Sequence, residues 1–544
     1  MEPISFKFDL EKGVLILFFA VMLYYGCAQV NEYKINIEYP HGYRANDAFF
    51  HPALARYIKD VGNFMYNPPY AAYGYNDTIH WYPPLLPYLT AQFSFLTGID
   101  PYNLIIFMLV LLTTFASLIM YFIIKHFNKS VALLSLPLMP FLFYKNFYVG
   151  FTWGQSGFIM GSFFFLAIFW VFTKLALKYS FVLLGLFLTG AALAHTSEFI
   201  LAIGFIVFYF FVEIVTKQFR ITELKTAIVA SIIFAVLSVY YLIIFKYDRV
   251  ANSGVELKFG SVTQTTAFLI GKFSDFGWLM PVIIIGIIFA LVLLFVQKKS
   301  SVALIVGIYM LLLGFTNYVI VGLAHFAFQT RFFWPVYLSG FFGLTLYQIS
   351  QVTYKKMNNT IFALISIGCI FLLMFTVYEK NSPDGLMDSS LWQAFTWIRD
   401  HTQKEDNLYF FYGDRYQQSG ILLATERNAW KVNPQDYISA LQNKTIKRFY
   451  ISDINQVDMY VRRGIFTFEH RNPTDPLQDI CSFNYYVFDK ISQYPPLIQY
   501  NQIIENMFLN LGWMETVYSS SLLDIVKNNK PGVNCVVFQN KTVE

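Results

Sequence analysis

Charged residues are scarce in this sequence of 544 residues. Only 13% of the residues are Asp, Glu, Lys or Arg, whereas 56% are hydrophobic. A soluble domain carries about 25% charged residues, so this composition excludes a soluble enzyme and is typical of a polytopic membrane protein. The net charge of +5 is small for the length, and no basic cluster lies in a part predicted to face water on the outer side, so no nucleic-acid partner is expected.

Motifs of several common enzyme classes are also absent. The sequence contains no nucleotide-phosphate loop, no zinc-type spacing of Cys and His, and no nucleophile elbow. The apolar runs have almost no charged residue at their centres, with Glu213 close to one end of its run, which disfavours an ion-coupled transporter or a channel. Of the four cysteines, Cys27 and Cys369 fall in apolar runs, whereas Cys481 and Cys535 fall in the polar C-terminal part, where a disulfide is permitted but not required.

Long hydrophobic runs dominate what is present. About eleven runs are long enough to span a bilayer, which takes about 20 residues each. The first, residues 14–30, is interpreted as a retained signal anchor, because its retention keeps the charge alternation between the runs in phase. The other ten spans are predicted at residues 103–125, 130–147, 152–173, 179–194, 197–216, 226–245, 276–297, 301–322, 331–351 and 359–378.

Basic residues lie in every second loop between these runs. The clusters are Lys125 with Lys129, Lys174 with Lys178, Lys217 with Arg220 and Lys225, Lys298 with Lys299, and Lys355 with Lys356. By the positive-inside rule these loops are cytoplasmic, and Lys7 and Lys12 place the N-terminus on the same side. The remaining loops and the chain after about residue 380 are therefore predicted to face outward from a multi-pass protein of the cell membrane.

Two parts follow from this pattern. Residues 1–380 are predicted to form a polytopic α-helical transmembrane domain, with long outer loops at 31–102 and 246–275. Residues 381–544 are predicted to form an extracytoplasmic soluble α/β domain. It begins with an amphipathic helix, and strand-like runs at 407–412, 448–452, 485–488 and 533–538 alternate with further helices.

The first outer loop contains two predicted helices. Residues 47–60 have an apolar side and a side predicted to stay wet, which carries Arg56, Lys59 and Asp60, so this helix is expected in the membrane interface. Residues 85–96 are apolar but too short to span the bilayer, and predict a second interfacial or re-entrant helix.

Asp47 and His51 are the strongest candidates for catalytic or metal-binding residues. They stand four residues apart at the start of the predicted interfacial helix, so they share one face of it. Such a pair can act as a base on an acceptor or bind a metal. A helix cap would also account for an acid at Asp47.

Three further places on the outer side carry candidate substrate-binding residues. His195 and Glu198 mark a tight turn between two hydrophobic helices, where helix capping is the alternative explanation. Arg331 is suited to a lipid phosphate, although an arginine that snorkels to the interface would look the same. His80 and Trp81 lie in an aromatic-rich segment that suits either a sugar or the membrane interface.

The order of these features resembles the GT-C superfamily of polytopic glycosyltransferases, which use lipid-phosphate-linked sugar donors at the outer face of the membrane. The segments that carry the resemblance extend over nearly the whole chain: Asn46-Asp-Ala-Phe-Phe-His51, Tyr82-Pro-Pro-Leu-Leu-Pro-Tyr-Leu89 with Leu96-Thr-Gly-Ile-Asp-Pro-Tyr102, Gly260-Ser-Val-Thr-Gln264, and Trp392-Gln-Ala-Phe-Thr-Trp-Ile-Arg-Asp-His-Thr402. The second is similar to archaeal members. The third and fourth are similar to the fifth outer loop and the soluble domain of oligosaccharyltransferase catalytic subunits.

The sequence departs from that oligosaccharyltransferase family in its acids. The family binds a divalent metal with the first-loop acid, an acidic motif in the second outer loop and a glutamate in the fifth. Here no acid lies between Lys145 and Gln155, and Gln264, which is a further candidate for substrate binding, stands at the fifth-loop position. A hard cation prefers several carboxylates, so no cofactor is expected. If Mn²⁺ or Mg²⁺ does bind, Asp47 and His51 are its expected ligands.

These observations favour an inverting, metal-independent glycosyltransferase with a polyprenyl-phosphate (dolichyl-phosphate type) sugar donor. The resemblance implies that Asp47 deprotonates the acceptor. From their chemistry, Arg331 together with His195 is expected to hold the leaving phosphate. The expected partners are this donor, the bilayer and a glycan, lipid or protein acceptor. Two alternatives stay open: a metal-dependent enzyme of the oligosaccharyltransferase type, and a non-catalytic scaffold that binds glycan or a partner. A transporter of lipid-linked sugars is less favoured.

Overall fold

The computed structural model describes residues 9–31, 37–62, 68, 79, 82–175, 177–245, 274–315, 330–353, 358–377, 385–411, 418–432, 434–443, 459–464, 467–471, 480–491 and 495–536. The expected domain boundary at residue 380 lies outside these ranges. Among the candidate site residues, His80, Trp81 and Gln264 also lie outside them.

Apolar helices make up the first part of the chain. Five stretches are long and apolar enough to cross a membrane, namely Leu10–Ala28, Pro101–Phe127, Thr196–Val215, Ile221–Ile244 and Asp275–Val296. Shorter apolar helices are Lys129–Phe143, Ser156–Phe172, Ser180–Ala194, Val302–Leu313 and Asn359–Leu373. The chain is therefore a multi-pass membrane protein, as its composition predicts, while the number of eleven spans stays a prediction.

Each predicted span overlaps a helix or a run of consecutive helices. The elements of this part are α1 (Leu10–Asn31), α2 (Asn46–Val61), α3 (Leu85–Thr97), α4 (Pro101–Phe127), α5 (Lys129–Ser135), η2 (Leu136–Phe143), α6 (Lys145–Thr152), α7 (Ser156–Phe172), α8 (Ser180–Ala194), α9 (Thr196–Val215), α10 (Ile221–Phe245), η4 (Ser274–Leu279), α12 (Met280–Leu291), η5 (Val292–Val296), α13 (Val302–Phe315), η6 (Thr330–Phe333), α15 (Trp334–Tyr337), α16 (Ser339–Thr353) and α17 (Asn359–Val377). The α-helix of α5 gives way to the 3₁₀ helix η2 at Pro137, because proline has no N–H to donate and disfavours the helical conformation of the residue before it.

The remaining elements form a small domain around a mixed sheet, which we call the sheet domain. They are α18 (Ser389–His401), β1 (Asn407–Phe411), α19 (Gln418–Thr425), β2 (Asn428–Val432), α20 (Pro434–Gln442), β3 (Met459–Arg462), β4 (Phe468–Arg471), η8 (Ile480–Ser482), β5 (Tyr485–Asp489), α21 (Pro495–Leu509), β6 (Met514–Ser519) and β7 (Leu523–Asn528). The main sheet has the order β2-β1-β5-β7-β6. Strand β1 is parallel to β2 and β5, while β7 is antiparallel to β5 and β6.

Both faces of the main sheet are covered, because side chains alternate along each strand. On one face Tyr409 and Phe411 of β1 pack with Tyr437 of α20, whose ring centroid lies 5.2 Å from that of Phe411. On the other face Phe410 packs against Phe395 of α18 at 6.0 Å. The sheet domain therefore has the layered helix and sheet arrangement that the strand-like runs at 407–412 and 485–488 predict.

Two of the predicted strands have other outcomes. Residues 448–452 lie outside the described residues. The strand expected at 533–538 is wrong over its described part, because residues 533–536 have no regular structure. The chain turns at Pro531 after β7, and Cys535 is joined there to Cys481 by a disulfide with a Cα–Cα distance of 5.4 Å. The sequence had left this pairing open.

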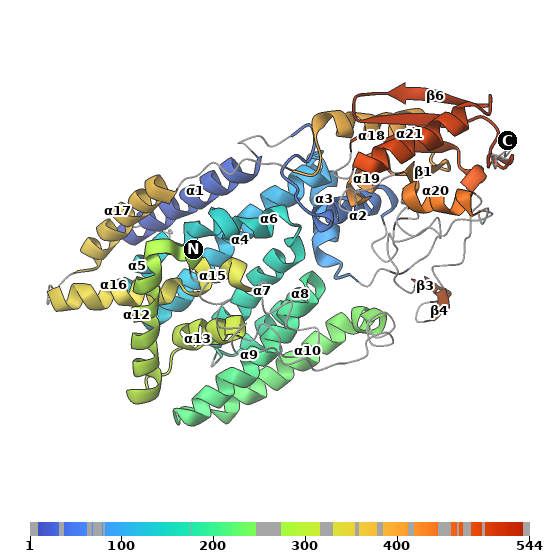
Figure 1. Cartoon of the computed structure of the whole chain (residues 1–544). Coiled ribbons are helices and arrows are strands. Elements are labelled where there is room, and N and C mark those ends of the chain that lie inside the picture. Colours follow the sequence, from blue (N-terminus) through green and yellow to red (C-terminus); the bar gives the residue numbers. More distant parts are fainter. Residues whose placement is uncertain are drawn as a thin grey trace.

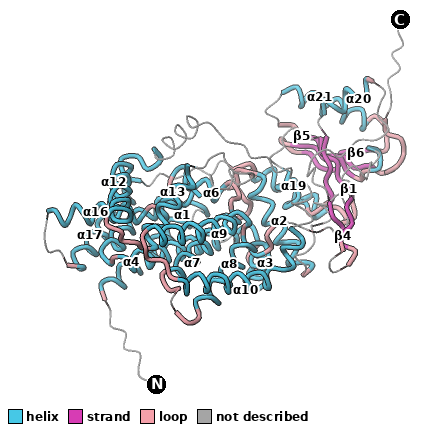
Figure 2. Tube along the Cα trace, turned by 90° about the horizontal axis from the view of Figure 1, so that it is seen from below, coloured by secondary structure: helices cyan, strands magenta, loops and turns pink. Residues whose placement is uncertain are grey.

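Figures 1 and 2 show the sheet domain at one end of the helical bundle, with α2 and α3 between the two. We call this the domain end of the bundle. The prediction that Arg56 of α2 faces water is wrong, whereas the placement of α2 in the membrane interface stays a prediction. Arg56 is buried, donating from Nη2 to the Asp100 carboxylate at 2.7 Å and from Nη1 to the Leu423 carbonyl at 2.7 Å and to Glu426 at 3.1 Å. These bonds fasten α2 to the start of α4 and to the end of α19.

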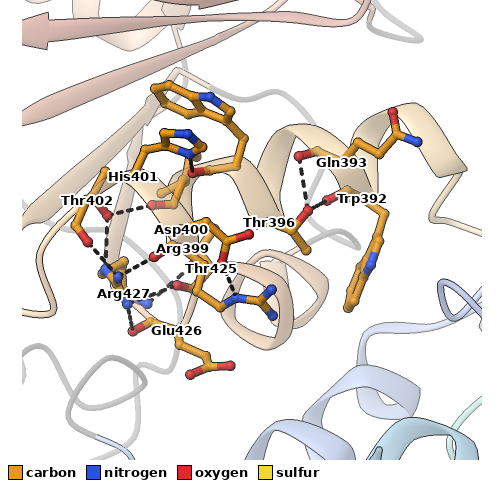
Figure 3. Close-up of polar contacts among 12 residues, drawn as sticks. Trp392, Gln393, Thr396, Arg399, Asp400, His401, Thr402, Thr425, Glu426 and Arg427 are labelled. Atoms are coloured by element: carbon orange, nitrogen blue, oxygen red, sulfur yellow. Dashed lines mark hydrogen bonds and ion pairs between the residues drawn. The ribbon is translucent and has the colours of Figure 1, made fainter.

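Arg427 holds the other side of this junction (Figure 3). Its guanidinium donates to the carbonyl oxygens of Arg399 at 2.7 Å and Thr402 at 2.8 Å, at the end of α18, and to the Thr402 hydroxyl at 3.0 Å. It also donates to the carbonyls of Thr425 and Glu426 at the end of α19. A cation where two helices end satisfies carbonyls that have no partner within their own helix. The α18–α19 pair is thereby held where Glu426 meets α2.

Candidate active site

The start of α2 carries the first two candidate residues. Asp47 is the second residue of the helix and is exposed, while His51 lies one turn later and is buried. The residue at the N-cap is Ala45, and no side chain makes a capping hydrogen bond there. The capping explanation for Asp47 therefore does not apply, and its remaining local benefit is the favourable place of an acid in the first helical turn.

Asp47 is held against the turn between α6 and α7. Gly154 in this turn has a φ of +77°, and a Cβ built on it would lie 2.2 Å from the Ala48 nitrogen and 2.4 Å from the Asp47 carbonyl carbon. The backbone N–H of Arg44 donates to the Thr152 carbonyl at 2.8 Å in the same place. Only glycine combines this left-handed conformation with so close an approach. The backbone at Asp47 is thus in contact with the segment that opens α7.

His51 on α2 is connected through Tyr82 to the turn between α8 and α9. Its ring centroid lies 4.9 Å from that of Tyr82, in an edge-on arrangement. A Cβ built on Gly157 of α7 would lie 3.0 Å from the Tyr82 hydroxyl oxygen and 3.2 Å from Cδ2 of His195. The three side chains therefore follow one another along the start of α7.

His195 and Glu198 form a buried pair at this turn. His195 Nδ1 is hydrogen-bonded to Glu198 Oε2, and Glu198 is 0% exposed. A Cβ on Gly161 would lie 3.0 Å from Glu198 Cγ and 3.1 Å from His195 Cβ. His195 occupies the N-cap of α9 without a side-chain capping bond. The pairing of the two side chains with each other replaces the helix cap that their spacing would also allow.

Three glycines explain how these elements come so close. Gly157 and Gly161 are one helical turn apart on one side of α7, and Gly154 lies in the turn that precedes this helix. The start of α2 packs at Gly154, Tyr82 at Gly157, and the His195–Glu198 pair at Gly157 and Gly161. Neither these glycines nor Tyr82 was singled out as a functional residue from the sequence. The spacing of Gly157 and Gly161 was the available signal.

Arg331 approaches the same segment from another side. It lies in η6, is 6% exposed and sits 5.3 Å above the ring of its neighbour Phe332. A Cβ on Gly150 of α6 would lie 3.6 Å from Phe332 Cβ, and Phe333 packs edge-on against Phe158 of α7. Residues from three distant parts of the sequence, at 47–51, 195–198 and 331, therefore all lie around the segment from α6 to the start of α7.

The described candidate residues can be compared with the ligand set of a divalent cation. Within the described ranges, no group of three or more His, Cys, Asp and Glu side chains is close enough to hold an ion. Asp47 and His51 are placed one helical turn apart, but the described part of the chain supplies no third such ligand to them. This donor set does not fit the divalent cation that the oligosaccharyltransferase resemblance implies.

Comparison with known proteins gives matches among solved structures. No protein-family model matches the chain, and no curated protein matches its sequence. The archaeal oligosaccharyltransferase AglB from Archaeoglobus fulgidus, in complex with an inhibitory peptide and a dolichol-phosphate, is similar with a TM-score of 0.53 at 12% identity, over 77% of this chain and 64% of that chain. An Archaeoglobus fulgidus oligosaccharyltransferase in complex with Zn and sulfate is similar with a TM-score of 0.55 at 14% identity, over 88% of this chain and 68% of that chain. The arabinofuranosyltransferase AftD from Mycobacteria is similar with a TM-score of 0.53 at 11% identity, over 97% of this chain and 41% of that chain.

The fold of the chain is similar to that of GT-C membrane glycosyltransferases. This confirms the resemblance that the sequence segments around Asp47 and Trp392 suggest. At identities of 11 to 14% the likeness shows the fold alone. The chain also spans only 64% of the length of AglB and 41% of AftD, so the activities of those GT-C proteins are not carried over with the fold.

Proposed function

We propose that the protein transfers a sugar from a polyprenyl-phosphate donor to an acceptor on the outer face of the cell membrane. One observation carries the proposal. In this GT-C-like fold, the backbone at Asp47, the His195 side chain and Phe332 beside Arg331 each lie close to one segment, which runs from α6 to the start of α7. An acid, an imidazole and a guanidinium placed around one segment would suit the transfer of a phosphate-linked group. The structure of AglB with dolichol-phosphate supports a lipid-phosphate donor.

The proposed reaction is a single displacement with inversion. The Asp47 carboxylate takes the proton of the acceptor group as the acceptor oxygen or nitrogen forms its bond to the anomeric carbon of the donor. The bond from that carbon to the phosphate oxygen breaks, and polyprenyl phosphate leaves with the electron pair. Arg331 and His195 stabilise the charge that grows on this phosphate. Asp47 is exposed, as an acid that meets an acceptor from water must be.

The proposed orientation places the N-terminus in the cytoplasm and the sheet domain outside. The Cys481–Cys535 disulfide supports this, because disulfides persist in oxidising compartments. Cysteines introduced at Lys299 and Lys404, both exposed, test it in a background without Cys27 and Cys369. A membrane-impermeant thiol reagent should label Lys404→Cys in intact cells and Lys299→Cys only after permeabilisation. Labelling of both from one side contradicts the topology and the site with it.

A metal-dependent enzyme of the oligosaccharyltransferase type is the second candidate, favoured by the structural likeness to oligosaccharyltransferases that include one bound to Zn and sulfate. The described residues around Asp47 and His51 include no third metal ligand, and this disfavours a metal-dependent enzyme. A non-catalytic scaffold is less favoured, because an exposed acid at a helix start, a buried His–Glu pair and the neighbours of a buried arginine all border the α6–α7 segment.

The test of the proposal is sugar transfer by purified protein in lipid nanodiscs. Asp47→Asn keeps the size of the side chain and removes the carboxylate, so transfer should fall about 10² to 10⁴-fold while the protein stays folded. Arg331→Ala should weaken donor binding and slow transfer together, because it acts on bound donor and leaving phosphate alike. Near wild-type transfer by Asp47→Asn would remove Asp47 as the base. A wild-type protein that transfers nothing but binds glycan would favour the scaffold.

A further inference from the structure

Glu198 is a carboxylate that no substrate can reach. It is 0% exposed in the first turn of α9, packed against Gly161 of α7 at the distances given above. Removing a carboxylate from water is costly unless a partner compensates it. The His195 imidazole is the group that hydrogen-bonds Oε2, whereas Oε1 accepts no hydrogen bond from any residue in the described ranges. The buried acid therefore acts on the one side chain that it meets, the imidazole.

The hydrogen bond at Nδ1 decides how the imidazole is presented. A histidine held at one ring nitrogen by a carboxylate has its tautomer and its ring rotation set, and the other nitrogen faces away from the carboxylate. The opposite edge of the His195 ring, where Cδ2 is bonded to Nε2, lies against Gly157 beside the Tyr82 hydroxyl. Tyr82 in turn contacts His51 on α2. The Nε2 edge thus lies on the side of the Tyr82 hydroxyl, and Tyr82 links this side to His51 on α2.

We infer that Glu198 is a positioning residue that holds His195 so that Nε2 meets the donor phosphate. The inference rests on the proposed polyprenyl-phosphate donor and goes beyond it by separating two roles in the pair. His195 touches the phosphate, whereas Glu198 acts only through His195.

A double-mutant cycle tests this division of roles. The probes are polyprenyl phosphate and the matching neutral polyprenol, bound to the full-length protein in nanodiscs. His195→Ala should weaken polyprenyl phosphate binding about 10 to 100-fold and leave polyprenol binding unchanged, since a hydrogen bond to a charged group is lost. Glu198→Leu, which removes the acceptor, should weaken it over the same range. Glu198→Gln, which keeps the volume and a neutral acceptor, should weaken it about 3 to 10-fold.

The decisive measurement is the effect of Glu198→Gln in the His195→Ala background. If Glu198 acts through His195, this second substitution should change the affinity for polyprenyl phosphate by less than about twofold. A matched control is Glu213→Gln. Glu213 is a buried glutamate on the same helix, near its other end, and accepts from the Ser300 hydroxyl at 2.5 Å. This variant should bind both probes like the wild type.

Two results overturn the inference. One is an equal loss of affinity from Glu198→Gln with and without His195, which would show that the acid acts independently of the imidazole. The other is an unchanged phosphate preference in both Glu198 variants while His195→Ala loses it. If the wild type binds polyprenyl phosphate no better than polyprenol, the proposed donor itself fails. Failure of the donor is therefore read from the wild type alone, and failure of the positioning role from the variants.

Discussion

Gly154→Ala is a small change with a large expected effect on catalysis. A methyl group at this position would lie 2.2 Å from the Ala48 nitrogen, whereas ordinary contacts of a Cβ begin at 3.4 Å. The start of α2 must therefore shift by about 1 Å, and such a displacement of a catalytic group can cost about 10²-fold in rate. The positive φ adds strain of about 1 to 2 kcal/mol for alanine, which is small beside the 5 to 15 kcal/mol that stabilises a typical fold.

The assay compares sugar transfer by Gly154→Ala and by Gly150→Ala in nanodiscs. Gly150 is the matched control, since a Cβ there meets Phe332 at 3.6 Å, an ordinary van der Waals distance. We expect Gly154→Ala to lose about 100-fold in transfer rate with an unchanged melting temperature within a few degrees, and Gly150→Ala to keep wild-type transfer. Full activity of Gly154→Ala would refute the reasoning, because the position of Asp47 against α7 would then have no catalytic importance.

The remaining predictions concern the sheet domain and the metal. Replacing Cys481 and Cys535 together by alanine should destabilise the sheet domain by about 4 kcal/mol, as loss of a loop closure of this length predicts, and a denaturant titration that shows no loss would contradict it. Burial and then the neighbouring Asp524 carboxylate raise the pKa of Glu505 to about 7. The folded domain therefore binds more protons than the unfolded chain between about pH 4.5 and 7, and its stability should fall by about 1 to 2 kcal/mol as pH rises through this window. Glu505→Gln should abolish that fall, and a pH-dependent loss that survives in the variant would exclude Glu505 as its source. Transfer activity should persist in the presence of a chelator, whereas activity that disappears and returns with Mn²⁺ or Mg²⁺ would favour the oligosaccharyltransferase alternative.

Much of the helical part could be predicted because its signals are local. Hydrophobic runs of spanning length mark the helices, and α3 follows from an apolar stretch of only 13 residues between prolines and Gly98. The strands β1 and β5 are equally local, since both are apolar runs buried in the centre of the sheet. Strand β2, which contains Asn428 and Lys431 among its five residues, and the largely exposed β6 carry no such run. Their identity depends on partner strands that the local sequence does not specify.

Arg56 shows why burial was harder to predict than helix formation. In the isolated helix its side chain lies with the polar residues, so it was expected in water. Its acceptors are Asp100, 44 residues away, and Glu426, 370 residues away in sequence. A long-range partner of this kind leaves no trace in the periodicity of α2.

The site was predicted in the same uneven way. Asp47, His195 and Arg331 could be singled out because their residue types are unusual at the edge of a membrane. What brings them together is the close approach permitted by Gly154, Gly157 and the turn beside them, which depends on the packing of α2 and α9 against α7. The role of Glu198 depends on the direction of one side chain, and only the structure supplies it.

A structure determined with a bound polyprenyl-phosphate sugar tests the central claim most directly. The account predicts the phosphate beside Arg331 and Nε2 of His195, with the anomeric carbon positioned so that an acceptor can lie between it and the Asp47 carboxylate. A donor phosphate bound away from the α6–α7 segment, or an anomeric carbon out of reach of any acceptor held by Asp47, would contradict it.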